Sequence, residues 1–159
     1  MGLGAHYPSL SRRPVFLRPM KPYNVAIIGY GWVSTAHIQA INATSHAQVT
    51  AVYSSRPQNA AELSARHGGR IEPFTDLDAM LRRPDIHAVS ICSYPHQHAA
   101  QAIAAARAGK HIILEKPISL SAADARAVAA AVKASGVRTC VCFECRFSSQ
   151  FLEIGRAHV

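Results

Sequence analysis

The segment GYGWVS, which begins at Gly29, has the glycine spacing of a phosphate-binding turn. It follows an apolar run and precedes a helical pattern, which is the context such a turn needs. Gly29 would permit the tight turn, Gly31 would let a pyrophosphate approach the backbone, and the helix from Ser34 would offer its N-terminal amides to the anion. A glycine-rich turn without a ligand is the alternative. The predicted cofactor contacts in this turn are Gly29, Gly31, Trp32 and Val33.

The residues after the second apolar run bear on the choice of cofactor. In dinucleotide-binding folds an acid about 20 residues beyond the glycines holds the ribose 2′-hydroxyl. This chain has Ser54, Ser55 and Arg56 there, and no carboxylate until Glu62. Two hydroxyls and a guanidinium would bind a 2′-phosphate, which a carboxylate would repel. The sequence therefore favours NADP(H), with NAD(H) as the alternative, and Ser55 can also cap the next helix.

Polar residues also end the fourth and fifth apolar runs, in SICSYPHQH at 90–98 and HIILEKPIS at 111–119. In the second segment Glu115, Lys116 and Pro117 set two opposite charges against a rigid ring, which can be a surface turn or part of a site. The crevice of a doubly wound sheet opens at the carboxyl ends of its strands. Both segments are therefore expected at that edge.

The four cysteines have no spacing that predicts a metal site. Cys140, Cys142 and Cys145 give C-x-C-x-x-C, but a zinc knuckle would need a second cluster. His96 and His98 share one loop, which is more typical of a helix entry than of a metal pair. We therefore predict reduced thiols and no metal.

Six apolar runs alternate with five helical patterns. The predicted strands are 24–29, 49–54, 70–74, 87–92, 111–114 and 138–143, and the predicted helices are 34–44, 57–68, 76–83, 96–109 and 121–136. The capping-box pairs Ser55–Gln58, Thr75–Asp78 and Ser121–Asp124 indicate helix starts, and Gly68, Gly109 and Gly136 indicate helix ends. This alternation predicts an α/β fold, a Rossmann-type doubly wound parallel sheet with right-handed crossovers.

Composition narrows the class of protein further. Hydrophobic residues make up 49% of the chain and aromatic residues 7%, which is typical of helices packed on a buried parallel sheet. The net charge of +8 includes four basic residues and no acid in residues 1–22. The positive charge of the remaining chain is typical of a domain that binds a phosphorylated ligand, so we expect no nucleic acid as partner. A DNA-binding leader is the alternative. No apolar run approaches the roughly 20 residues that a bilayer requires.

The two ends of the chain differ from its centre. We expect residues 1–22 to be a disordered basic leader, or an extension from a start codon called too early. The pair Arg12 and Arg13 lacks the apolar stretch of an export signal, so we expect a cytoplasmic protein. The last six residues, IGRAHV, are what one frame of a common sequencing adapter encodes. Residues 152–159 are therefore expected to be a truncated end derived from adapter sequence, with a genuine C-terminal tail as the alternative.

The chain resembles the N-terminal domain of the glucose-fructose oxidoreductase, inositol dehydrogenase and rhizopine-catabolism family (Gfo/Idh/MocA). The resemblance rests on GYGWVSTAH, on SICSYPHQHAAQAIAAARAGKHIILEKPIS and on FECRFSSQF, and it covers about residues 23–151. It implies a dinucleotide-binding domain over 23–151 and hydride transfer between a nicotinamide and a carbon of a sugar, polyol or similar alcohol. It also implies a further substrate domain with an Asp-x-x-x-His pair, and a homo-oligomeric full-length protein.

The resemblance also implies roles for individual residues. Lys116 would be catalytic, bonding the reacting oxygen and helping its proton to move. Glu115 would set the cofactor ribose and the lysine, and Pro117 would fix the chain direction through a cis bond. Ser93, Pro95 and His98 would line the cofactor, and Arg146 would lie near the nicotinamide. Glu144 departs from the Asn or His more usual in the family. A non-catalytic dinucleotide sensor is the alternative, against which the retained Lys116 argues.

Overall fold

The structure, a computed structural model, describes residues 21–150 and Glu153 of the 159-residue chain. The predicted leader, apart from Lys21 and Pro22, and the predicted adapter-derived end, apart from Glu153, lie outside the described residues. Over the described part the chain forms six strands, five α-helices and one 3-10 helix. The strands are β1 (Tyr23–Ile28), β2 (Ala47–Tyr53), β3 (Glu72–Phe74), β4 (Ala88–Ile91), β5 (His111–Glu115) and β6 (Thr139–Cys142). The helices are α1 (Trp32–Asn42), α2 (Ala60–His67), α3 (Leu77–Leu81), α4 (Pro95–Arg107), α5 (Ala122–Ser135) and the 3-10 helix η1 (Glu144–Phe147).

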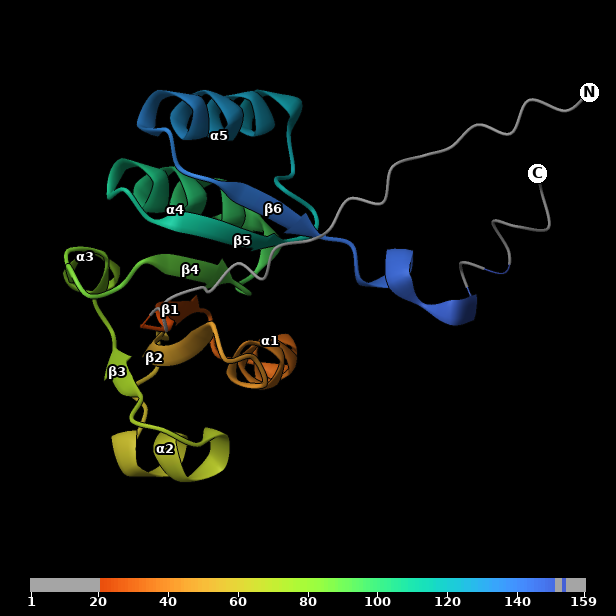
Figure 1. The fold of residues 1–159 in the computed structure, drawn as a ribbon. Helices are drawn as coiled ribbons and strands as arrows, with labels where there is room; N and C mark the ends of the chain where they lie inside the picture. Colours follow the sequence, from red (N-terminus) through yellow and green to blue (C-terminus); the bar gives the residue numbers. More distant parts are fainter. Residues whose placement is uncertain (1–20, 151–152, 154–159) are drawn as a thin grey trace, which may run out of the picture.

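The described strands form one parallel sheet in the order β3-β2-β1-β4-β5-β6. The chain starts at the centre, moves outward to β3, returns to β4 beside β1, and moves outward again to β6 (Figure 1). This confirms the predicted Rossmann-type doubly wound sheet. The direction of travel reverses between β1 and β4, so the loops that follow these two strands diverge and leave a crevice between them.

Apolar side chains on both faces of the sheet hold the helices in place. On one face Ile38 of α1 and Leu63 of α2 pack with Ile27 and Val52. On the other face α3, α4 and α5 pack on the sheet through residues that include Met80, Ala102, Ala105 and Val128. Strands buried on both faces need near-continuous apolar runs, which explains why the composition predicted this architecture.

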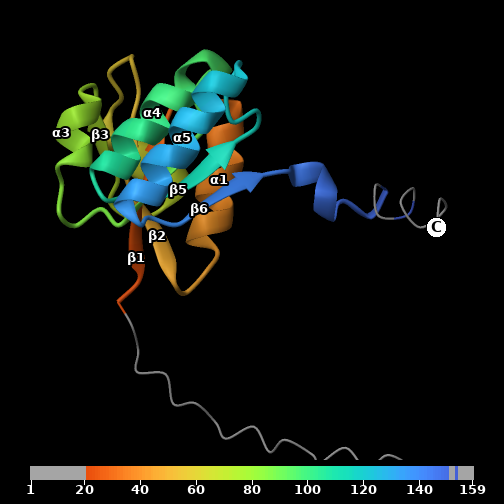
Figure 2. The same cartoon turned by 90° about the horizontal axis from the view of Figure 1, so that it is seen from above.

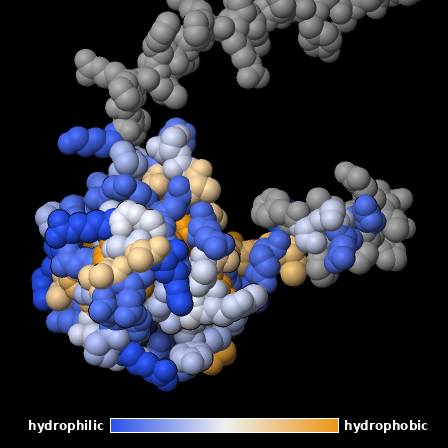
Figure 3. All heavy atoms as spheres, turned by 90° about the horizontal axis from the view of Figure 1, so that it is seen from below, coloured by the Kyte–Doolittle hydropathy of each residue, from blue (hydrophilic) through white to orange (hydrophobic). Residues whose placement is uncertain are grey.

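The surface and the far end of the sheet complete the fold. The face drawn in Figure 3 is mostly hydrophilic, with apolar residues in small separate areas. After β6 the chain extends away from the body of the domain through η1, as Figures 1 and 2 both show. Among the described residues, no helix combines the length and apolarity that crossing a bilayer would require.

Two of the predicted helix caps are wrong. Helix α2 is capped by Asn59, whose side chain accepts from the amides of Ala61 and Glu62, and not by Ser55. Helix α3 is capped by Asp76, which accepts from Ala79, and not by Thr75. Asn and Asp cap helices at least as well as Ser and Thr, so in each helix the residue nearer the first turn takes the role. The third predicted cap is confirmed, since Ser121 accepts from the amide of Asp124.

The cap of α2 gives a test of this local structure. Asn59→Ala removes both capping bonds and should lower the free energy of unfolding by about 1 kcal/mol. Ser55→Ala is the matched control, and because Ser55 is exposed and caps nothing it should change that free energy by less than about 0.5 kcal/mol. Urea unfolding measures the free energy of unfolding of both variants. A larger decrease in Ser55→Ala than in Asn59→Ala would show that Ser55 caps the helix.

Candidate functional site

The turn between β1 and α1 requires a glycine at position 29. Gly29 has a φ of +89°, and a Cβ there would lie 2.6 Å from the Cα of Ser93 in the loop after β4. A side chain would therefore be strained twice, by the backbone conformation and by the contact. Gly29 thus lets the loops after the two central strands lie against each other.

Gly31 has the opposite surroundings. It caps α1 in an extended conformation, and a Cβ at this position would meet no atom within 4 Å. Ser34, fully buried, accepts from the Gly31 amide at 2.9 Å and donates to the Gly31 carbonyl at 2.6 Å, so it braces the turn where the fingerprint has a third glycine. The space in front of Gly31 is what the close approach of a phosphate requires.

A cleft of about 470 Å³ opens in front of this turn. Of the predicted site residues, it brings together Gly29, Gly31, Trp32, Val33, Ser54, Ser55, Arg56 and Ser93. Tyr30, Tyr53, Gln58, Cys92, Tyr94 and Gln97 also line it. Its floor runs from the N-terminus of α1 over the carboxyl ends of β1, β2 and β4, where an anion is favoured by unpaired helix amides.

The loop after β2 gives the cleft a basic, hydroxyl-bearing wall. Ser54 is buried and its hydroxyl accepts from the amide of Arg56 at 3.2 Å, which shapes the turn. Ser55 and Arg56 are exposed. None of the described residues that line the cleft is acidic.

His98 lies beneath the cleft rather than in it. The side chain is 1% exposed, and its ring nitrogens lie 3.0 Å from the Ser93 carbonyl and 2.7 Å from the Pro117 carbonyl. Its geometry therefore ties the loop after β4 to the segment after β5, and it reaches the cleft through the backbone of Ser93. Pro95 occupies the first turn of α4, where a missing N–H costs nothing.

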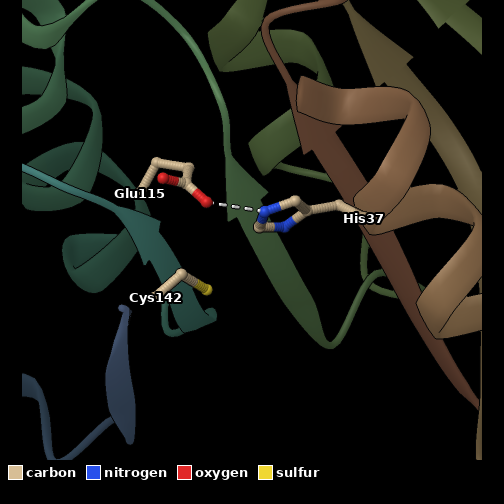
Figure 4. Close-up of side chains that lie close together, drawn as sticks. All are labelled: His37, Glu115 and Cys142. Atoms are coloured by element: carbon tan, nitrogen blue, oxygen red, sulfur yellow. Dashed lines mark hydrogen bonds and ion pairs between the residues drawn. The ribbon is translucent and has the colours of Figure 1, made fainter. Parts of the chain in front are cut away.

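Glu115 is buried at the end of β5 and is held from two sides. One carboxylate oxygen lies 2.9 Å from Nε2 of His37, and the other accepts from the amide of Lys116 at 3.2 Å. The second ring nitrogen of His37 lies 2.8 Å from the hydroxyl of Ser90. His37 comes from α1 and therefore joins the dinucleotide helix to β4 and β5, as Figure 4 shows for its bond to Glu115.

Lys116 pairs with a residue far along the chain. Its ammonium lies 3.3 Å from a carboxylate oxygen of Glu144, and both side chains are about half exposed. The pKa of the Glu144 carboxyl is held below its usual range, first by a hydrogen bond from the backbone N–H of Glu144 itself and then by the Lys116 ammonium. The bond between Lys116 and Pro117 is cis, as expected. Arg146 is exposed on η1 and does not line the cleft.

Sequence reasoning missed His37. The residue stands in the segment GYGWVSTAH, but its partner Glu115 is 78 positions away, so spacing along the chain gives no sign of the contact. It also missed Cys142, whose thiol joins the pair: ligand-type atoms of His37, Glu115 and Cys142 all lie within 4.8 Å of one another. Figure 4 shows the three side chains close together. The prediction of no metal rested on sequence spacing and stays a prediction.

These features define a dinucleotide-binding α/β domain. Comparison with known proteins gives the family: the sequence model of the oxidoreductase family with an NAD-binding Rossmann fold, Gfo/Idh/MocA, matches residues 23–143, and the chain belongs to this family. The chain is 36% identical over 135 residues to levoglucosan dehydrogenase of Pseudarthrobacter phenanthrenivorans, covering 80% of this chain and 34% of that protein. It is 31% identical over 129 residues to scyllo-inositol 2-dehydrogenase (NADP(+)) of Bacillus subtilis, covering 81% and 39%.

Solved structures agree with this assignment. The WlbA dehydrogenase of Bordetella pertussis, in complex with NADH and UDP-GlcNAcA, is similar with a TM-score of 0.77 and 26% identity. The match covers 86% of this chain and 42% of that one. The chain thus spans well under half the length of these relatives.

The cysteines allow a test of the site's packing. Burial, followed by the field of Glu115, raises the pKa of the Cys142 thiol to about 11, and burial raises the pKa of Cys92 to about 12. A raised pKa leaves little thiolate at pH 8, so both should react slowly with iodoacetamide there and faster as the pH rises toward those values.

Cys140 and Cys145 are exposed and serve as internal references in the same sample. Mass spectrometry of a short alkylation at pH 8, in metal-free buffer, should find these two residues labelled first. Labelling of Cys92 ahead of Cys140 would contradict the packing of the β4 end.

Proposed function

We propose that this chain is the cofactor-binding part, residues 23–151, of an NADP-dependent dehydrogenase that acts on a sugar, a polyol or a related alcohol. The observation that carries the proposal is the cleft in front of Gly31, which has hydroxyl and guanidinium groups on its β2 side and no acid among its described lining residues. A 2′-phosphate would add two negative charges beside Arg56, which pairs with phosphate through two parallel N–H bonds.

The relatives support the reaction class, but they differ in the cofactor. Two relatives are named as dehydrogenases of levoglucosan and scyllo-inositol, the second with NADP(+), whereas a similar structure holds NADH. The preference for NADP in this chain therefore depends on its own residues at 54–56. Because the chain spans only part of its relatives, the complete protein's second domain and homo-oligomeric state belong to the proposal.

In the proposed mechanism a nicotinamide supplies hydride transfer to or from the carbon that bears the reacting oxygen. Gly31 and the first turn of α1 would receive the pyrophosphate, and Trp32, Val33 and Ser93, which line the cleft, would border it. Pro95 and His98 keep the loop after β4 in place, and Glu115 fixes the backbone from which Lys116 projects. Arg146 would lie near the nicotinamide.

Lys116 would donate a hydrogen bond to the reacting oxygen and stabilise the charge that develops there. Its partner Glu144 would keep the ammonium at the edge of the sheet until a substrate oxygen replaces the carboxylate. Since both side chains are half exposed, this exchange needs no buried charge to be separated.

Cofactor preference can be measured on this chain because Trp32 is its only tryptophan and lies in the cleft. Quenching of Trp32 fluorescence should show tighter binding of NADPH than of NADH. Arg56→Ala should weaken NADPH binding by about tenfold to a hundredfold, as expected for a charge-assisted bond, and leave NADH binding nearly unchanged.

Arg66→Ala is the matched control, since Arg66 is exposed on α2 and does not line the cleft. It removes the same charge and should leave both affinities unchanged. Tighter binding of NADH, unaffected by Arg56→Ala, would refute the NADP preference.

The role of Lys116 needs the complete protein and a panel of sugars and polyols. Lys116→Ala should lower kcat by about 10²–10⁴-fold with nearly unchanged cofactor affinity, because the lysine acts on the reacting oxygen. Lys133→Ala, an exposed lysine on α5, is the control and should retain activity. Full turnover in Lys116→Ala would exclude a catalytic role.

A further inference from the structure

We propose that His37, Glu115 and Cys142 form a binding site for a divalent cation of the zinc class. The three residues come from α1, from the end of β5 and from the end of β6. Their ligand atoms, an imidazole nitrogen, a carboxylate oxygen and a thiol sulfur, all lie within 4.8 Å of one another. Nitrogen, oxygen and sulfur donors of these kinds are the ligands that zinc takes in proteins.

The rigid core sets this geometry. Glu115 and Cys142 are register partners on neighbouring strands, so their side chains leave the sheet together. His37 reaches the pair from the helix that covers the same end of the sheet (Figure 4). Ligand atoms around a tetrahedral zinc lie roughly 3.3–3.8 Å apart, given bonds of 2.0–2.3 Å. The pair at 2.9 Å would open slightly, and the thiol, which lies within 4.8 Å of both partners, would move inward by up to about 1.3 Å to reach this arrangement.

The residues behind the ligands are arranged as in metal sites. A metal-binding imidazole needs its other nitrogen held, and Nδ1 of His37 lies 2.8 Å from the hydroxyl of Ser90. The carboxylate oxygen of Glu115 that faces away from His37 accepts from the amide of Lys116 at 3.2 Å. Both ligands are therefore already oriented before an ion arrives, which lowers the cost of ordering them.

Proton and charge balance also permit the ion. On binding, the cation takes the place of the proton between Nε2 of His37 and Glu115, and that proton moves to Nδ1, which then donates to Ser90. The hydroxyl of Ser90 can reverse from donor to acceptor. The thiol of Cys142 releases its proton to solvent. A dication with one carboxylate and one thiolate is neutral, so binding takes the half-buried site from the single negative charge of Glu115 to no net charge.

Three protein ligands leave at least one coordination position open, unlike the closed set of four in structural zinc sites. The proposed site is therefore of the open kind. It lies beside Lys116, one residue after Glu115, at the same edge of the sheet. The inference does not depend on the proposed function, since it uses no property of the cleft.

The test is a titration of the 159-residue chain, without an affinity tag, with Zn²⁺ and separately with Co²⁺. Calorimetry should find one tight zinc equivalent in the wild type, and Co²⁺ should give a thiolate charge-transfer band. Cys142→Ser should abolish that band, and Cys142→Ser or His37→Gln should each weaken zinc binding by about 100-fold or more, beyond the loss typical of outer-sphere changes.

Cys140→Ser and Cys145→Ser are the matched controls, because both thiols are exposed and belong to the same cysteine run. They should leave the affinity and the band unchanged. Equal weakening by either control would place the ion on the C-x-C-x-x-C run and overturn the proposal, and so would tight zinc binding that survives Cys142→Ser.

X-ray absorption at the zinc edge decides the question even if His37→Gln does not fold. The proposed site predicts one sulfur near 2.3 Å with nitrogen and oxygen neighbours in the wild type. Two or more sulfurs, or none, would contradict it, as would the absence of tight binding.

Discussion

The close contact between Gly29 and the backbone of Ser93 is the constraint on which the rest of the site depends. β1 and β4 are neighbours at the centre of the sheet, and the chain leaves them in opposite directions. The loops that follow can form one continuous floor only if they touch, and a Cβ on Gly29 would come within 2.6 Å of Ser93. With hydrogen in place of Cβ, the first turn of α1 and the loop after β4 lie together under the cleft.

From this floor a chain of contacts runs to the charged end of β5. Ser93 offers its carbonyl to His98, and the other nitrogen of that ring faces the carbonyl of Pro117. A second connection runs from α1 through His37 to Glu115. Two connections, one through His98 and one through His37, therefore link the floor of the cleft to the segment Glu115–Pro117 at the end of β5. A displacement of one would strain buried hydrogen bonds to the other, and such bonds are costly to leave unmade.

The fold could be predicted from sequence because it follows from local patterns. Apolar runs predict the strands, glycines mark the helix ends, and the alternation of strands with helices predicts a doubly wound sheet. Each run and each helix end is recognised within a few residues of sequence. Even the wrong caps at Ser55 and Thr75 were errors of a few positions, since Asn59 and Asp76 cap the same two helices. The sequence could place residues 29, 31–33 and 54–56 at one cleft for the same reason, because the glycine turn and the end of β2 have fixed places in this fold.

Contacts between distant segments had no such signal. Lys110, just before β5, is 7% exposed, and its ammonium donates to the carbonyls of Arg83 and Ile86. Nothing in the sequence indicated this contact. The ion pairing of Lys116 could not be read from the sequence either. Its neighbour Glu115 would be the obvious partner, yet His37 engages that carboxylate, and the ammonium pairs with Glu144 instead. An acid and a base adjacent in sequence point to different neighbours here, because one side chain is buried in the sheet and the other is at its rim. The buried acid can then hold the backbone still while the exposed base keeps the freedom to change partners.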